Sequence, residues 1–205
     1  MTIWGVSSGR AGTQSLAKQL GGVHEPRPWF GTKVVEYRRH PITKREPVME
    51  ILRYRHGLGV PVVDLQHSYL IPDILEVDPE AEFIWTYRDP WNCIASFLAG
   101  GGWTDQNGWG KDLPSPGGCG RTPGWGTAGV YPRIIKAIYH WVYTNQTILE
   151  TSEGLDVTLY GVEDLTERVG AWSGEPYVLS YEEKALIQCF CESLYRKIDR
   201  LKERG

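Results

Sequence analysis

The sequence lacks any arrangement of cysteine and histidine that is typical of a zinc site. It contains only four cysteines, and two of them, Cys189 and Cys191, are separated by a single residue, which is a poor spacing for metal ligands. No second cysteine pair with zinc spacing and no HxxxH pair completes a site. We therefore expect reduced, structural thiols and no required metal.

An excess of positive charge is also lacking. The formal net charge is -3 over 205 residues. A general nucleic-acid-binding protein usually carries a basic excess, so nucleic acid is not an expected partner. A small anionic ligand remains compatible with this balance, because a local cluster of basic side chains can bind an anion whatever the net charge.

Long apolar runs are absent as well. No stretch approaches the ~18 apolar residues of a membrane-spanning helix, and the N-terminus has no basic segment followed by an apolar one. We therefore expect a cytoplasmic protein with no membrane partner. The hydrophobic content of 41% favours a folded chain, and the length suits one domain over residues 1–205.

Strand-like and helix-like stretches alternate through the first half of the chain. Apolar strands are expected at residues 2–8, 60–65 and 82–87, and helices at 13–20, 48–54 and 92–98. This alternation predicts parallel βαβ units and a three-layer α/β/α fold around a central parallel sheet. The pattern continues with a helix at 132–150, a strand within 156–165 and a last helix that begins at Ser180 with a capping box.

Two stretches depart from this alternation. Residues 24–46 are polar, basic and interrupted by proline, and within them residues 36–46 are predicted to form a charged surface or a mobile loop. Residues 100–129 contain eleven glycines and three tryptophans. Loops of about thirty residues are often lids or binding loops. Tryptophan on a flexible backbone suits sugar rings or aromatic molecules, so this loop is a candidate acceptor site; packing onto the domain is the alternative.

A glycine-rich segment, Gly5-x-x-x-Gly9-Arg10-x-Gly12-Thr13, lies where the first strand gives way to a helix. Such a turn lets backbone N–H groups converge on an anion, and Arg10 adds a guanidinium with bidentate geometry for phosphate or sulfate. The Gly-Lys-Ser/Thr ending of nucleoside triphosphatases, whose hydroxyl holds magnesium, is missing. The ordinary alternative is a tight turn with a solvated arginine.

A second feature follows the strand at 82–87. Arg88 comes directly after this strand, and Ser96 lies eight residues on, two turns into the next helix. Because ligands of parallel sheets bind at the carboxyl ends of strands, both side chains could reach one anion there. In the alternative interpretation, Arg88 pairs with Asp89 or Glu82 and Ser96 is an ordinary surface residue.

Together these motifs resemble the sulfotransferase family that uses 3'-phosphoadenosine 5'-phosphosulfate (PAPS). After its first strand, that family has a five-residue motif of the form (R/K)-x-G-T-(T/S). Here the motif corresponds to residues 10–14, Arg-Ala-Gly-Thr-Gln, and Gln14 replaces the usual hydroxyl residue. The family also has an arginine after a later strand and a serine eight residues beyond, here Arg88 and Ser96. The resemblance covers roughly residues 1–98 and 131–165. It implies a fold like that of P-loop-containing nucleoside triphosphate hydrolases, of the sulfotransferase type.

The resemblance also implies a donor site. The first motif would hold the 5'-phosphosulfate and the second the 3'-phosphate, with Arg10 neutralising the bridging oxygen as its bond to sulfur breaks. PAPS is the implied co-substrate, no metal is needed, and the acceptor would be a small molecule or glycan. The implied donor-binding residues are Ser8, Gly9, Arg10, Ala11, Gly12, Thr13, Gln14, Arg88 and Ser96.

Transfer to a hydroxyl or amine requires a general base. Some branches of the family place a glutamate after the first helix, followed by an aromatic pair; here Glu25 is followed by Trp29 and Phe30. Another branch places a histidine near the position of His67. We favour Glu25 and keep His67 and His24 open. A solvated carboxylate and a core histidine are the ordinary alternatives.

Two other functions remain open at this point. A non-catalytic module that binds adenosine bisphosphate would keep the donor site without the chemistry. A nucleotide kinase-like phosphotransferase would share the fold, but the missing lysine and hydroxyl in the glycine-rich segment disfavour it. The oligomeric state is left open.

Overall fold

The computed structural model describes residues 2–31, 33–99, 133–166 and 177–203. The glycine- and tryptophan-rich segment at 100–129, predicted as an acceptor loop, lies outside the described residues. Among the described helices, none is long and apolar enough to cross a membrane.

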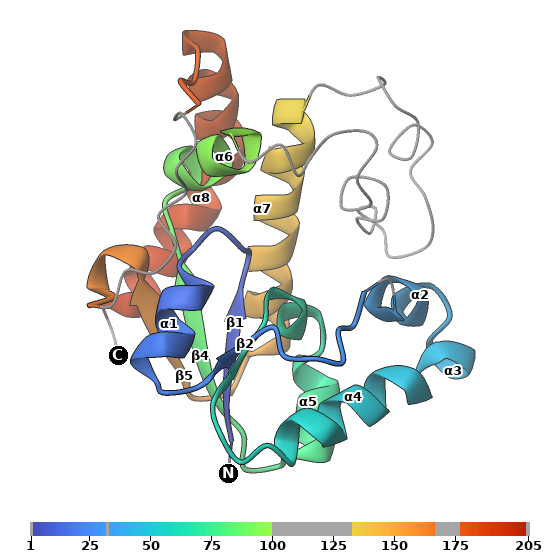
Figure 1. Cartoon of the computed structure of the whole chain (residues 1–205). Coiled ribbons are helices and arrows are strands. Elements are labelled where there is room, and N and C mark those ends of the chain that lie inside the picture. The colour runs from blue at the N-terminus through green and yellow to red at the C-terminus, as the bar shows by residue number, and fades with distance from the viewer. Residues whose placement is uncertain (1, 32, 100–132, 167–176, 204–205) are drawn as a thin grey trace.

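A five-stranded sheet with all strands parallel forms the centre of the described structure (Figure 1). Its order is β2-β3-β1-β4-β5. The strands are β1 (Ile3–Ser7), β2 (Val23–His24), β3 (Val62–Val63), β4 (Glu82–Tyr87) and β5 (Val157–Gly161). The predicted α/β fold with a parallel sheet is confirmed. Strand β2 was not predicted, because two residues are too few to show a strand pattern.

Helices flank the sheet on both sides. They are α1 (Thr13–Gln19), α2 (Lys33–Arg39), α3 (Pro41–Lys44), α4 (Glu46–His56), α5 (Ile71–Val77), α6 (Pro90–Ala99), α7 (Arg133–Thr151) and α8 (Tyr181–Lys202), with the short helices η1 (Leu65–Tyr69) and η2 (Val162–Asp164). The capping box of α8 is present: the Ser180 hydroxyl accepts from the Glu183 N–H, and the Glu183 carboxylate accepts from the Ser180 N–H.

Of the two interpretations of residues 36–46, the mobile loop was wrong, because most of these residues lie in α2, α3 and the start of α4. The charged surface is confirmed, since most of the described side chains in this stretch are exposed. The apolar signal of α2 is small, since Val34 is buried and the half-buried Tyr37 packs beside the core one turn later, while the rest of the segment is charged. Helix α4 also extends beyond the expected 48–54, because Pro47 lies in its first turn and starts the helix early.

Alternate side chains of the strands form two separate cores. Trp4 and Val6 of β1 point into the larger core, together with Phe83 and Trp85 of β4 and residues of α4 to α8. On the opposite face, Val63 and Ile84 pack with Leu16 and Ala17 of α1 and with Leu165. Because both faces of the sheet are covered by apolar packing, the molecule has the predicted three layers.

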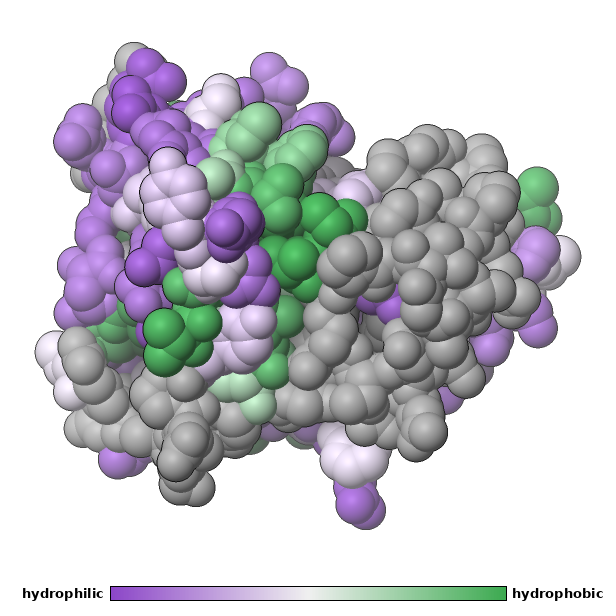
Figure 2. Space-filling view, turned by 90° about the horizontal axis from the view of Figure 1, so that it is seen from above, coloured by the Kyte–Doolittle hydropathy of each residue, from purple (hydrophilic) through white to green (hydrophobic). Residues whose placement is uncertain are grey.

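The order of the strands creates a switch point at β1. The chain leaves β1 toward β2 and β3 on one side, whereas β4 and β5 lie on the other side. In open parallel sheets, ligands bind at the carboxyl ends of the strands where such a reversal occurs. Seen from above, hydrophobic side chains gather at the centre of this end, beside hydrophilic ones (Figure 2).

Gly12 provides a stability prediction for the β1–α1 turn. Its φ is +81°, and a Cβ there would lie 2.5 Å from Cδ1 of Leu165 in the smaller core. Gly9 has a similar φ of +78°, but a Cβ there would meet Phe97 at an ordinary 3.6 Å. Both alanine variants should lose about 1–2 kcal/mol from the left-handed backbone. Gly12→Ala should lose roughly 1–3 kcal/mol more from overpacking.

The matched pair tests the crowding around Gly12, because both glycines have a left-handed backbone and only Gly12 lies against Leu165 and Val162. Urea unfolding followed by circular dichroism measures both variants. Equal losses for Gly9→Ala and Gly12→Ala would contradict the packing assigned to Gly12.

Candidate active site

The segment after β1 is held by hydrogen bonds from η1 and from α7. The hydroxyl of Ser68 accepts from the backbone N–H of Ser7 and donates to its carbonyl, each at 2.8 Å. Nε2 of His140 donates to the carbonyl of Ser8 at 2.8 Å. Burial lowers the pKa of His140 to about 4, so the ring stays neutral and keeps this donor role at neutral pH. The loop is therefore preorganised by residues far away in the sequence.

Within this loop, the backbone takes a left-handed conformation at Gly9, Arg10 and Gly12. Among the described residues, the non-glycine residues with positive φ are Arg10, at 52°, and Glu25, at 44°. Such conformations are uncommon away from glycine, and they cluster at functional sites. Both residues were catalytic candidates from the sequence alone.

Arg88 follows β4 and contacts the loop after β1, at the edge where the sequence predicted it to lie. Its Nη1 donates to the carbonyl of Arg10 at 3.4 Å. Asp89, the alternative partner, instead accepts from the backbone and side-chain N–H groups of Asn92 at the start of α6. The two halves of the predicted donor site therefore meet at the carboxyl edge of the sheet.

Ser96 lies one helical turn after Cys93 on α6, and Cys93 donates through its thiol to the carbonyl of Gly9 at 3.4 Å. Residues three apart share a helix face, so Ser96 is on the side of α6 that faces the loop. Of the remaining predicted donor residues, Ser8 and Ala11 are fully buried, Thr13 is half-buried and Gln14 is exposed.

Glu25 lies at the same edge, directly after β2. Its backbone N–H donates to the carbonyl of Val63 at 2.9 Å, and its side chain remains 42% exposed. Partial burial raises the pKa of Glu25, the negative charge of Asp64 raises it further, and Arg55 opposes the rise. A partly exposed carboxyl with a raised pKa suits a general base near neutral pH.

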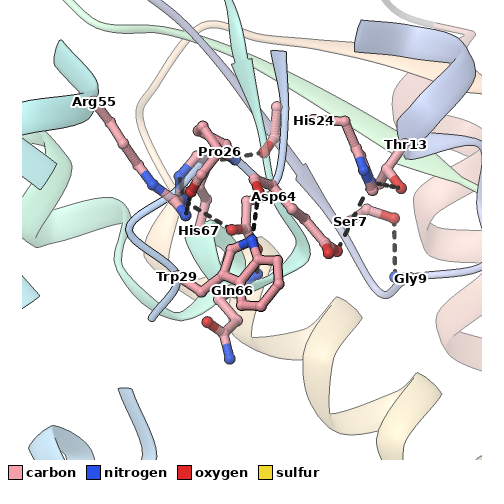
Figure 3. Close-up of polar contacts among 12 residues, drawn as sticks. Ser7, Gly9, Thr13, His24, Pro26, Trp29, Arg55, Asp64, Gln66 and His67 are labelled. Atoms are coloured by element: carbon pink, nitrogen blue, oxygen red, sulfur yellow. Dashed lines mark hydrogen bonds and ion pairs between the residues drawn. The ribbon is translucent and has the colours of Figure 1, made fainter. Parts of the chain in front are cut away.

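His67 has a different environment, in a buried network below the edge (Figure 3). The fully buried Arg55 donates through Nη1 to Asp64 and to Nε2 of His67, each at 2.8 Å. Nδ1 of His67 donates to the carbonyl of Gly5 at 3.2 Å. Burial lowers the pKa of His67 to about 3. Both ring nitrogens are engaged and the side chain has no exposed surface, so its position is that of a core histidine.

The same network also holds the backbone that follows Glu25. Nη2 of Arg55 donates to the carbonyl of Pro26 at 3.1 Å, and the Arg55 guanidinium lies 4.1 Å from the centre of the Phe30 ring. Asp64 in turn accepts from the backbone N–H of Gln66, capping η1. A single buried arginine thus connects α4, the segment after β2 and the start of η1.

Sequence reasoning missed the supporting residues Arg55, Asp64, Ser68 and His140. Arg55 lies in the last turn of α4 next to Arg53 and His56, where basic residues usually lie in solvent and complement the helix dipole. Only the packing of α4 shows that one of these side chains points inward.

Within the described ranges, no group of three or more His, Cys, Asp and Glu side chains could hold a metal ion.

No protein-family model and no curated protein matches this chain. Among solved structures, a sulfotransferase domain from the curacin biosynthetic pathway matches it with 14% sequence identity and a TM-score of 0.44. The match covers 80% of this chain and 67% of that one. The two chains are therefore distant.

Proposed function

We propose that this chain is a sulfotransferase that moves a sulfuryl group from PAPS to a hydroxyl or amine of a small-molecule or glycan acceptor. The observation that carries the proposal is the contact of Arg88 with the carbonyl of Arg10. It brings together two motifs, 78 residues apart, that the family uses for the two phosphate-bearing ends of one donor.

The charges at this edge fit a metal-free anion site. Arg10 is exposed at the tip of the loop and Arg88 is half-buried beside it. Two guanidinium groups suit phosphate and sulfate oxygens, which accept bidentate hydrogen bonds. No Gly-Lys-Ser/Thr ending supplies the magnesium-holding hydroxyl of a nucleoside triphosphatase. A phosphosulfate donor therefore fits these residues better than a nucleoside triphosphate.

The proposed reaction is an in-line displacement at sulfur. The carboxylate of Glu25 takes the proton of the acceptor hydroxyl as the acceptor oxygen bonds to sulfur. The bond between sulfur and the bridging oxygen breaks, and adenosine 3',5'-bisphosphate leaves with the electron pair. The guanidinium of Arg10 stabilises the negative charge that develops on that oxygen.

Binding of adenosine 3',5'-bisphosphate tests the donor site. We expect the protein to bind it without a metal, and Arg88→Ala to weaken binding by about 1.5–3 kcal/mol, roughly 10-fold to 150-fold in Kd, because a charge-assisted hydrogen bond is lost. Arg10→Ala should have a similar effect. Isothermal titration calorimetry measures both. Arg53→Ala is the matched control, since Arg53 is an exposed arginine paired with Glu46.

Stabilisation by magnesium ATP, with none by the bisphosphate, would contradict the proposal and favour a phosphotransferase. Transfer itself is measured with PAPS carrying radioactive sulfur and a pool of phenols, alcohols, amines and sugars. Binding of the bisphosphate without transfer to any member of the pool would favour a non-catalytic binding module.

A further inference from the structure

His24 lies between the donor loop and the general base. It is the last residue of β2, directly before Glu25. Its Nε2 is 3.0 Å from the hydroxyl oxygen of Thr13 and 3.7 Å from Oε1 of Glu25. Figure 3 shows the imidazole beside Thr13, at the end of the loop that contains Gly9. One nitrogen atom thus faces both a residue of the predicted donor site and the predicted base.

Whether Nε2 of His24 carries a proton depends on whether the Thr13 hydroxyl donates its own proton to it. A hydroxyl can donate one hydrogen bond and accept others, so Thr13 can either donate to an unprotonated Nε2 or accept from a protonated one. His24 is half-buried, and burial lowers its pKa against the opposing charge of Asp64. The ring is therefore neutral at neutral pH and carries its proton on only one nitrogen.

An anion in the loop removes this freedom. The oxygens of a phosphate or sulfate dianion only accept hydrogen bonds, so Thr13 must donate its proton to the anion. Its oxygen can then only accept from His24, which requires the proton to be on Nε2. The same N–H faces the carboxylate of Glu25. At 3.7 Å this is an electrostatic contact and not a hydrogen bond. The partial positive charge of an N–H beside a carboxylate favours its charged form, which is the form that a general base needs.

We propose that His24 is a positioning residue that couples the two halves of the reaction: an anion bound by Thr13 selects the Nε2–H tautomer of His24, which then stabilises the Glu25 carboxylate. This inference rests on the proposed function, since Glu25 is the base there. The coupling is reciprocal, so the charge on Glu25 also favours anion binding through His24. The other charged groups that act on this pair are Asp64 and Arg55.

Nitrogen NMR of protein labelled at histidine tests the coupling, with adenosine 3',5'-bisphosphate as the probe. On saturation, Nε2 of His24 should move to the protonated position and Nδ1 to the unprotonated one. His67 and His140 provide internal references, because hydrogen bonds to backbone carbonyls hold them as the Nδ1–H and the Nε2–H forms. Thr13→Val, which keeps the shape but lacks the hydroxyl, should bind the probe more weakly and show no tautomer change at saturation.

Kinetics provide the second readout. His24→Phe should move the acid limb of the kcat profile to higher pH, because Glu25 loses the nearby N–H dipole, 3.7 Å away, that favours its charged form. His24→Gln, whose amide nitrogen can replace Nε2–H, should restore the wild-type limb. A merely structural histidine would change stability and leave the limb in place.

The outcomes separate the two proposals. Binding of the bisphosphate with no change of the His24 tautomer, or an acid limb that is the same in wild type and His24→Phe, would overturn the coupling and leave the sulfotransferase proposal intact. Failure of the bisphosphate to bind would overturn both.

Discussion

Replacing Glu25 by glutamine is expected to reduce sulfuryl transfer by about 10²–10⁴-fold, the usual contribution of a positioned general base. Glutamine has the same shape but cannot take the acceptor proton. Binding of adenosine 3',5'-bisphosphate should stay within about 3-fold of wild type, because an uncharged amide removes no direct contact to the donor and a charge effect through His24 is small at this range. Transfer is measured with radiolabelled PAPS and the acceptor identified from the pool.

The comparison variant is His67→Ala. It should lower stability, because it leaves Arg55 without one of its partners, but the folded protein should transfer sulfate at a rate far above that of Glu25→Gln. A loss of transfer in His67→Ala with full activity in Glu25→Gln would reverse the assignment of the base.

The pH dependence of transfer follows from the same residue. Because burial and Asp64 raise the pKa of Glu25, its carboxyl keeps the proton to a higher pH than an ordinary glutamate. The base form is the deprotonated one, so kcat/KM, which reports the free enzyme, should increase with pH through a midpoint above that of free glutamate. A midpoint at or below the ordinary value would show that Glu25 is not the titrating group.

Removing the charge of Asp64 is expected to have the largest effect on stability. Asp64→Asn should cost about 3–5 kcal/mol, since it leaves the fully buried Arg55 without its counter-charge. Such a loss is a large part of the ~5–15 kcal/mol that stabilises an ordinary domain. Asparagine keeps an oxygen that can accept from the Gln66 N–H, so the loss should come from the charge rather than the cap.

Chemical denaturation measures this loss, with the exposed pair of Arg53 and Glu46 as the matched control. The two ions lie 2.6 Å apart with most of their surface in water, so Glu46→Gln should change stability by less than about 1 kcal/mol. Similar losses of stability for the two variants would contradict the importance of the buried pair.

In Asp64→Asn, the acid limb of the pH profile of sulfuryl transfer should also shift to lower pH, because the charge that raises the pKa of Glu25 is gone.

Much of the architecture followed from the sequence alone. Strand and helix patterns alternate in the first half of the chain, and parallel strands all end at the same edge of a sheet. Arg10 and Arg88 each follow a predicted strand, so the sequence predicted that they would share one edge. Glu25 was a candidate only through the family resemblance, and it reaches this edge because the unpredicted strand β2 precedes it. The sequence also predicted where α8 starts, because its capping box depends only on the nearby residues Ser180 and Glu183.

Other features depended on contacts between distant segments. Strand β2 has two residues and exists because β3 pairs with it, and α2 is held by a few apolar side chains within a charged sequence. Neither leaves a periodic pattern long enough to recognise. The sequence also could not show that Arg55, in a run of basic residues, points into the protein.

The environments of the candidate bases likewise depend on tertiary structure. Glu25, His24 and His67 are all candidate bases by residue type and position, and the sequence could not separate their environments. Whether each is exposed, and which protonation state it favours, depends on burial and on neighbours such as Asp64 and Arg55, which come from other elements. Packing of α4 and η1 against the sheet buries His67 and leaves Glu25 at the surface, because desolvation is a property of the folded chain and not of the local sequence.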